Sequence, residues 1–386
     1  MCDVPALRFP EFTGEWERHK LSEVCSFYSG GTPSSSKKEY YNGNIPFIRS
    51  GELHKDYTEL FITEAGLSNS AAKLVETGDL LLALYGATSG DIAISKIKGA
   101  INQAILCIRT KQNKKFIESV WNKHVERLLQ TYLQGGQGNL SADIVKNIPF
   151  YFANSNEQDK LAKFISLLDE RIATQNKIIE KLETLIKGIV DSIFTANEFP
   201  KVPFKEIYVR AGEGGTPATS NPEYYVNGTI PFIKIDDLQN KYIKTNKDCI
   251  TELGLQKSSA WIVPANSIIY SNGATIGAIS INLFPVCTKQ GILGVVPKAD
   301  INVEFLYYFM TSTAFTKAVE RIVTEGTMRT AYLKDINHIP CPVPCSVKQD
   351  EIAKLLSTLS EKLENEVIFQ MKLQKQKEFL LSQMFI

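Results

Sequence analysis

The sequence predicts a mixed α+β protein with a pseudo-two-fold internal repeat, in which two tandem α/β domains are each followed by a long helix. Three observations predict this fold class. Motifs recur in order in both halves, each half begins with short strand-like runs between Gly, Pro and Asn turns, and each half ends in a heptad pattern. The 386 residues, 44% of them hydrophobic, suffice for two domains with separate cores.

The internal repeat consists of eight motifs that keep the same order in the two halves of the chain. Because chance does not preserve the order of so many matches, we infer a duplication. The matching motifs are Gly-Gly-Thr-Pro at 30–33 and 214–217, Glu-Tyr-Tyr at 39–41 and 223–225, Ile-Pro-Phe-Ile at 45–48 and 230–233, Ile-Thr-Glu at 62–64 and 250–252, Gly-Ala-Thr at 86–88 and 273–275, Gln-x-Ile at 103–105 and 290–292, Ile-Pro at 148–149 and 339–340, and Gln-Asp at 158–159 and 349–350.

Each repeat begins with a domain that we expect to span residues 1–152 in the first copy and 197–346 in the second. Residues 79–84 and 266–270 are typical of strands, because these runs are short, apolar and bounded by turn residues. A helical pattern follows near the end of each domain. This mixture favours an α/β arrangement over an all-β one.

A long helix is predicted after each domain, at 153–196 and at 347–386. Apolar residues recur there at heptad spacing, which is typical of a coiled coil, although polar Glu366 and Lys377 interrupt the second seam. The seam residues are Leu161, Ile165, Leu168, Ile172, Ile179, Leu182, Ile186, Ile352, Leu356, Leu359, Leu363, Leu373 and Leu380. Because a folded domain separates the helices, we expect them to pair antiparallel. The alternative is that each helix packs on its own domain.

Composition narrows the function. With 43 basic and 42 acidic residues, the chain cannot hold a nucleic acid by bulk charge, so any such binding needs locally placed cations. No run approaches the roughly 20 apolar residues of a membrane helix, and no signal peptide is recognised. Seven scattered cysteines favour reduced thiols in the cytoplasm over a disulfide framework, and the pair Cys341 and Cys345 lacks the second pair of a zinc site.

Motifs for catalysis are missing from the sequence. An adenine methyltransferase needs an Asn-Pro-Pro-aromatic loop, and the nearest string is Asn-Pro-Glu-Tyr at 221–224, which the first repeat replaces with Lys-Lys-Glu-Tyr at 37–40. We interpret this string as a turn. The sequence has no phosphate-binding loop, and its four histidines have no counterparts between repeats. We therefore expect no catalytic residue, no metal and no cofactor in this chain.

The doubled motifs resemble one known family. The opening Leu-Arg-Phe-Pro-Glu-Phe at 7–12, the Gly-Gly-Thr-Pro segments, the Tyr-Tyr pairs before Ile-Pro-Phe-Ile, the Gly-Ala-Thr loops and the Gln-Asp-led helices are similar to the DNA-specificity subunits of type I restriction–modification systems. The resemblance covers essentially the whole chain, and its specificity lies in the doubled order of the motifs.

The resemblance implies a non-catalytic protein with two target-recognition domains that bind double-stranded DNA at an asymmetric, two-part sequence. It implies that the two helices dock two methyltransferase subunits, and that restriction and translocase subunits join this core. Adenine methylation and cleavage would then belong to the partners, which would also bind the methyl donor and ATP.

Candidate DNA contacts are polar side chains on loops that recur in both repeats, because such groups read base edges. In the first repeat they are Thr32, Tyr40, Tyr41, Arg49, Tyr85, Thr88, Gln103, Gln137 and Asn139. In the second they are Thr216, Tyr224, Tyr225, Lys234, Asn272, Thr275, Lys289, Gln290 and Arg329. Structural roles stay open: Gly-Gly-Thr-Pro as a turn, the tyrosines as packing aromatics, and the glutamines as buried amides.

Two other classes of function stay open. The chain could be a self-contained methyltransferase or nuclease, against which the missing motifs count. It could also be a scaffold whose coiled coil holds other proteins while the domains bind no DNA, which its near-neutral charge permits.

Overall fold

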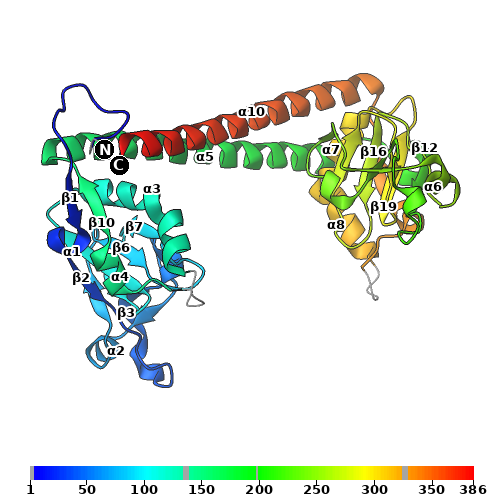
Figure 1. The fold of residues 1–386 in the computed structure, drawn as a ribbon. Helices are drawn as coiled ribbons and strands as arrows, with labels where there is room; N and C mark the ends of the chain where they lie inside the picture. The colour runs from blue at the N-terminus through cyan, green and yellow to red at the C-terminus, as the bar shows by residue number, and fades with distance from the viewer. Residues whose placement is uncertain (1–3, 134–138, 197–198, 324–328) are drawn as a thin grey trace. The chain divides into compact units, whose positions relative to one another are not determined.

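The computed structural model describes residues 4–133, 139–196, 199–323 and 329–386 (Figure 1). It consists of two compact units, unit 1 formed by Met1–Asn176 with Ile368–Ile386, and unit 2 formed by Lys177–Val367. Each unit holds one mixed α/β domain and a segment of both long helices, α5 (Ser155–Thr195) and α10 (Ser346–Met384). The predicted fold class is confirmed. Within the described ranges, no helix has the length and apolar character needed to cross a membrane.

The α/β domain of unit 1 contains two four-stranded sheets, ordered β2-β9-β6-β7 and β4-β3-β8-β5, and a closing pair β1-β10. Its elements before α5 are β1 (Glu17–Lys20), α1 (Leu21–Val24), β2 (Cys25–Ser29), η1 (Lys38–Tyr40), β3 (Tyr41–Ile48), η2 (Ser50–Glu52), β4 (Phe61–Ile62), α2 (Glu64–Ser68), β5 (Lys73–Val75), β6 (Leu80–Ala83), β7 (Ile92–Ile94), β8 (Gly99–Ile101), β9 (Ile105–Thr110), α3 (Lys114–Leu133), α4 (Ala142–Asn147) and β10 (Pro149–Phe152). Most pairs are antiparallel, whereas β3 and β8 run parallel with Ile48 opposite Ile101.

The α/β domain of unit 2 also has two sheets and a closing pair, β11-β20, but its first sheet has five strands, ordered β12-β19-β16-β17-β14, and its second has three, ordered β15-β13-β18. Its elements before α10 are β11 (Lys201–Pro203), η3 (Phe204–Glu206), β12 (Tyr208–Glu213), η4 (Pro222–Tyr224), β13 (Ile230–Ile233), η5 (Ile235–Asp237), β14 (Tyr242–Ile243), β15 (Asp248–Ile250), α6 (Glu252–Gln256), β16 (Ser267–Ser271), β17 (Ile279–Asn282), β18 (Cys287–Thr288), β19 (Ile292–Pro297), α7 (Val303–Thr311), α8 (Thr313–Ile322), α9 (Leu333–Ile336) and β20 (Pro340–Pro342). The parallel pair is repeated as β13 and β18, with Ile233 opposite Thr288.

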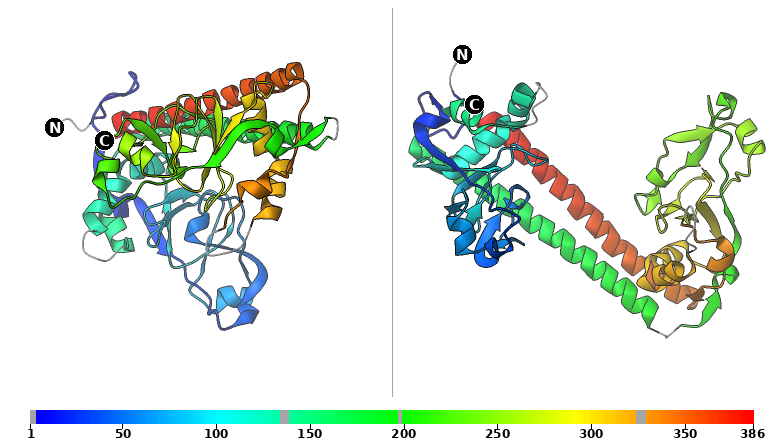
Figure 2. Two further views of the ribbon diagram at one scale, coloured as in Figure 1. Left: turned by 90° about the vertical axis from the view of Figure 1, so that its right-hand side faces the viewer. Right: turned by 90° about the horizontal axis from the view of Figure 1, so that it is seen from below.

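The interior strands β6 and β16 of the two first sheets are buried at every residue, which explains their apolar runs at residues 80–83 and 268–270. In unit 1, Leu80 and Leu82 of β6 pack toward α3, where Phe116 and Trp121 are fully buried. The alternate residue Leu81 faces the second sheet. Helix, sheet and second sheet thus form three layers. Figure 2 shows the ribbon of the chain from two further sides.

The two long helices run antiparallel beside each other within unit 1. The ion pair between Asp169 and Lys377 spans 2.6 Å, and Leu161 and Ile165 share a core with Met384. That core also contains residues of the α/β domain, so in unit 1 helix α5 both pairs with α10 and packs on its own domain, which the sequence presented as alternatives.

The predicted seam residues are all buried or half-buried in their own units. Some apolar residues outside the seams are exposed, such as Leu167 at 55% and Leu355 at 50%. In unit 2, Ile186 and Val190 of α5 pack against the core that contains Ile352 and Leu356 of α10. A coiled coil that continues along the whole length of both helices stays a prediction.

The Gln-Asp motif joins each long helix to the α/β domain that precedes it. In unit 1, Asn113 Nδ2, just before α3, donates a hydrogen bond of 2.8 Å to Asp159 Oδ1. In unit 2, Asn302 Nδ2, just before α7, donates one of 2.7 Å to Asp350 Oδ1. We call Asn113 with Gln158 and Asp159, and their counterparts in unit 2, the Asn–Gln–Asp clamp.

Candidate nucleic-acid interface

The Gly-Gly-Thr-Pro segments lie flat against the rest of their domains. A Cβ atom on Gly30 would lie 1.8 Å from the carbonyl oxygen of Ile101, and one on Gly214 would lie 2.0 Å from that of Thr288. The second glycines are also crowded, with 2.5 Å between a Cβ on Gly31 and the Cβ of Ala71. Only glycine permits this approach of backbone to backbone, so the segment is a frame that presents the next residues.

The frame brings predicted residues together in both units. Thr32 Oγ1 donates to Gln103 Oε1 in unit 1, and both side chains are exposed. In unit 2 the Gln290 backbone N–H donates to Thr216 Oγ1 at 3.3 Å, and the Gln290 side chain is exposed. These glutamines are therefore not buried amides, and they stand beside the threonine of the frame as polar groups facing solvent.

The predicted tyrosines support the frame. Tyr41 donates its phenol hydrogen to the carbonyl oxygen of Pro33 at 2.6 Å, and Tyr225 does the same to Pro217. Tyr40 is only 8% exposed and accepts a hydrogen bond from Lys37 Nζ at 2.9 Å. Tyr224 is half-buried. The packing role left open by the sequence thus describes these four aromatic rings.

The predicted cations Arg49 and Lys234 are paired with carboxylates. Arg49 Nη2 lies 2.7 Å from Glu52 Oε1 and 3.2 Å from Glu59 Oε2, and Lys234 Nζ lies 2.9 Å from Asp248 Oδ2. Burial of Glu52 opposes its ionisation, but the hydrogen bonds from Arg49 and Thr58 outweigh burial and lower the pKa of Glu52 to about 2. A base contact by Arg49 would have to compete with these carboxylates.

The Gly-Ala-Thr loops hold one exposed and one buried candidate in unit 2. Thr275 is exposed and lines a pocket of about 430 Å³ with Arg329, whose carbonyl oxygen accepts a hydrogen bond from the Ala274 N–H. Asn272 is 2% exposed, and its Nδ2 donates to the Ala331 carbonyl at 3.2 Å. The interpretation of Asn272 as a base reader therefore does not fit this conformation, in which it is a buried structural amide.

The corresponding candidates of unit 1 differ in their exposure. Tyr85 and Thr88 are half-buried, and burial raises the pKa of Tyr85. Asn139 is exposed, next to Leu140, whose N–H donates to the Leu84 carbonyl at 2.7 Å. Gln137 lies outside the described residues. In unit 2, Lys289 is exposed beside Gln290.

Sequence reasoning missed an exposed cation in each unit that lies on an aromatic ring. The guanidinium carbon of Arg210 lies 4.1 Å from the ring centroid of Trp261, and that of Arg109 lies 5.1 Å from the centroid of Tyr28. Arg109 also pairs with Asp79 at 3.0 Å, whereas no ion pair of Arg210 is found within the described part of the chain. A stacked guanidinium keeps its N–H edge free for phosphate. Alignment of the repeats could not reveal these pairs, because Arg109 and Arg210 are not equivalent.

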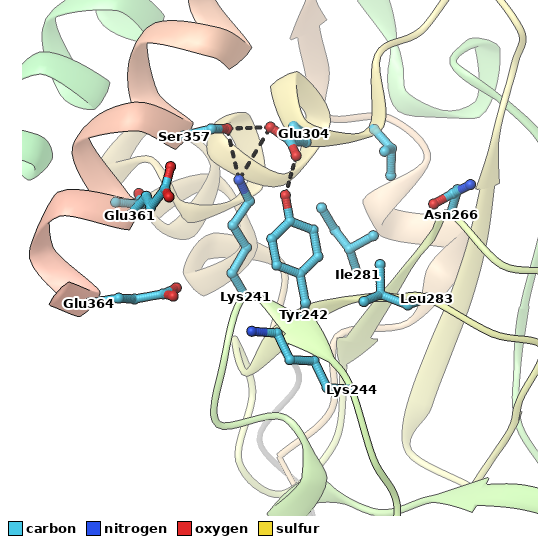
Figure 3. A pocket seen from close by; sticks show the side chains of 12 residues that line it. Lys241, Tyr242, Lys244, Asn266, Ile281, Leu283, Glu304, Ser357, Glu361 and Glu364 are labelled. Carbon is cyan, nitrogen blue, oxygen red and sulfur yellow. Dashed lines mark hydrogen bonds and ion pairs between the residues drawn. The ribbon is translucent and has the colours of Figure 1, made fainter. Parts of the chain in front are cut away.

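A polar pocket of about 580 Å³ lies in unit 2 between the α/β domain and α10 (Figure 3). Lys241 Nζ donates to Ser357 Oγ at 2.8 Å and to Tyr308 Oη at 3.1 Å, and lies 3.3 Å from Glu304 Oε2. Burial disfavours charge on Lys241, but these partners more than compensate and raise its pKa. Because buried Lys241 is paired with half-buried Glu304, this cluster ties the start of β14 to α7 and α10. Among the described side chains, no group of three His, Cys, Asp or Glu is placed to hold a metal ion.

Comparisons with known proteins point to one family. A family model described as the type I restriction modification DNA specificity domain matches residues 13–184 and again residues 201–372. The MjaIX specificity subunit of a type I restriction enzyme from Methanocaldococcus jannaschii is 24% identical, over 95% of this chain and 92% of its own length. The EcoR124I/EcoR124II specificity subunit from Escherichia coli is 27% identical, over 46% of this chain and 45% of its own length.

A solved structure shares the fold along the whole chain. The S subunit of a type I restriction-modification system from M. genitalium aligns with a TM-score of 0.60 and 16% sequence identity, and the alignment covers 99% of each chain.

Replacing Gly30 with alanine tests the backbone frame. Because the new Cβ would lie 1.8 Å from a carbonyl oxygen, the backbone must shift, and we expect the free energy of unfolding to fall by about 3 kcal/mol. Gly51→Ala is the matched control, since a Cβ there meets nothing within 4 Å. Urea denaturation of both variants measures the difference. Equal stability of the two would contradict the proposed crowding.

Replacing Arg49 with glutamine tests the pairing with Glu52 through pH. The pKa of Glu52 is lower in the folded state than in the unfolded chain, so its ionisation stabilises the fold above pH 4.5, and this stabilisation is lost as the pH falls toward 2. We expect Arg49→Gln to be destabilised by about 1–3 kcal/mol at pH 7, because Glu52 is 4% exposed, and by much less near pH 2. Denaturation midpoints at several pH values measure this, with Arg127→Gln as an exposed control. A difference that does not change with pH would contradict the pairing.

Proposed function

We propose a function that starts from family membership: the chain belongs to the type I restriction modification DNA specificity family. In this proposal it is the non-catalytic specificity subunit of a type I restriction–modification complex. It binds double-stranded DNA at a two-part, asymmetric target and directs adenine methylation and restriction by partner subunits. The observation that carries the proposal is the presence of two family domains, at 13–184 and 201–372, in one chain.

The two domains have a common frame but different side chains, which suits the reading of two different half-sites. The crowded glycines and the tyrosine hydrogen bonds recur in both units. Around them the exposed side chains differ: unit 1 has Asn139, whereas unit 2 has Lys289 and Arg329. Amides suit adenine and cations suit guanine or phosphate, so these differences favour different sequences.

We assign the exposed candidates that are not paired with a carboxylate to DNA contact, and the buried ones to support. Thr32, Gln103 and Asn139 in unit 1, and Thr275, Lys289, Gln290 and Arg329 in unit 2, are proposed to face the DNA. Arg210 is added as a phosphate contact, because its guanidinium lies stacked on Trp261 in an exposed position. Tyr40 and Asn272, which are 8% and 2% exposed, are proposed to hold the loops.

The proposed protein partners are two methyltransferase subunits and the restriction and translocase subunits of the complex. Exposed apolar side chains on the long helices support docking there, since Phe379 is 60% exposed and Met371 52% exposed in unit 1. The methyl donor and ATP are assigned to these partners. We place the complex in the cytoplasm, which suits the free thiols of all six cysteines in the described residues.

Methylation mapping by single-molecule sequencing tests the function. Cells that express this chain with its methyltransferase subunit are expected to carry methyladenine in a gapped, two-part motif that disappears when only this chain is deleted. Exchange of residues 30–150 for those of another family member should change one half of the motif and leave the other half unchanged. A scaffold role would instead leave methylation independent of this chain, and a change in both halves would contradict two separate readers.

A further inference from the structure

The Asn–Gln–Asp clamp is built from the same atoms in both units. Besides the bond to the aspartate, the backbone N–H of Asn113 donates to Gln158 Oε1 at 3.1 Å, and that of Asn302 donates to Gln349 Oε1 at 2.9 Å. The two glutamines are each 1% exposed. Their Nε2 atoms donate to the carbonyl oxygens of Ala153 and Pro344, at 2.7 and 3.0 Å. The glutamine is therefore held in one orientation at the point where the chain leaves the α/β domain and enters the long helix.

The asparagine also fixes the helix that carries the domain core. Asn113 Oδ1 accepts the N–H groups of Lys115 and Phe116 at 3.0 and 3.1 Å, and thereby caps α3. Asn302 Oδ1 accepts those of Glu304 and Phe305 at 2.9 and 3.0 Å and caps α7. One side chain thus binds the start of the domain helix with its oxygen and the start of the long helix with its nitrogen.

Other polar contacts between domain and helices differ from one unit to the other. In unit 1, Lys115 Nζ lies 2.7 Å from Asp169 Oδ2. In unit 2 the residue that follows Asn302 by two positions is Glu304, and it takes part in the cluster of Lys241 and Ser357 (Figure 3). The clamp, in contrast, is a polar connection found in both units, so it is not a by-product of one domain's sequence.

We propose that the clamp asparagines and aspartates are positioning residues, which hold each recognition domain at one angle on its long helix and so restrict the gap that the protein accepts between its two half-sites. This inference rests on the proposed function. Directional hydrogen bonds resist rotation, whereas apolar contacts alone permit small shifts of one packed element on another.

The geometry of DNA makes such a restriction necessary. One extra base pair moves a half-site by about 3.4 Å and turns it by about 35°, because about 10 base pairs make one turn of roughly 34 Å. A domain that swings on its helix could follow this change and accept a longer or shorter gap. A domain that is clamped cannot do so, and it binds at one spacing.

An exchange of donor and acceptor tests the clamp without removing the helix cap. Asn113→Asp keeps an oxygen that caps α3, but it places a second carboxylate next to Asp159 and removes the hydrogen bond. Asp159→Asn in the same chain supplies a new donor, so the double variant regains the bond with its direction reversed. Asn122→Asp, an exposed residue of α3, is the matched control for the added charge.

The measurement uses the full chain with its methyltransferase subunit and a plasmid library in which the gap between the native half-sites varies by one or two base pairs. For Asn113→Asp we expect methylation at gaps one base pair longer or shorter to rise about tenfold relative to the native gap. The half-site sequences should be unchanged. The double variant and Asn122→Asp should keep the preference of the unaltered protein. In unit 2, Asn302→Asp alone should relax the gap preference in the same way, and Asn302→Asp combined with Asp350→Asn should restore it.

Two outcomes would overturn the inference. One is that Asn113→Asp lowers methylation equally at all gaps, which would make the clamp a source of stability alone. The other is that the half-site sequence changes while the gap preference does not, which would make the clamp part of base reading. Failure of the unaltered protein to direct methylation to any two-part site would instead refute the proposed function.

Discussion

The structure depends on the joint between each α/β domain and its long helix. At this joint a buried glutamine, an aspartate on the first turns of the long helix and an asparagine at the start of the domain helix share one hydrogen-bond network, made once around Asn113 and once around Asn302. The glutamine is buried, so its polar groups must be satisfied there, whereas the aspartate is exposed and its hydrogen bond adds a directional contact to the joint. The network holds a helix of the α/β domain, α3 or α7, and the solvent-facing loops belong to the same domain.

The frame for those loops is made of glycine rather than of a side-chain network. Gly30 and Gly214 lie where any larger residue would overlap a carbonyl oxygen, and the tyrosines of the next motif bond back to Pro33 and Pro217. Such a frame tolerates change in the exposed residues beside it, because those residues take no part in holding it. A duplicated domain can therefore acquire a second sequence preference while its fold stays the same.

The two copies differ in their ionic contacts. Lys115 of unit 1 pairs with Asp169 of the long helix, while Glu304 of unit 2 faces Lys241 and Ser357. The stacked guanidinium belongs to Arg109 on β9 in one unit and to Arg210 on β12 in the other. The positions of charged residues can differ between the copies because an ion pair constrains geometry less than backbone packing does. Each unit needs only a nearby opposite charge for each paired residue.

The sequence by itself determined the duplication, the α+β class, the two long helices and their seams, because these depend on periodic patterns and on the order of motifs. It also singled out Thr32 with Gln103 and Thr275 with Arg329 as polar groups on shared loops. Only the tertiary structure decided which candidate side chains are exposed and not paired with a carboxylate. Arg49 is paired with Glu52, Asn272 is buried against Ala331, and the Gln-Asp motif proves to bind an asparagine that lies about 45 residues away in the chain. Burial and pairing depend on residues distant in sequence, which no local pattern reports.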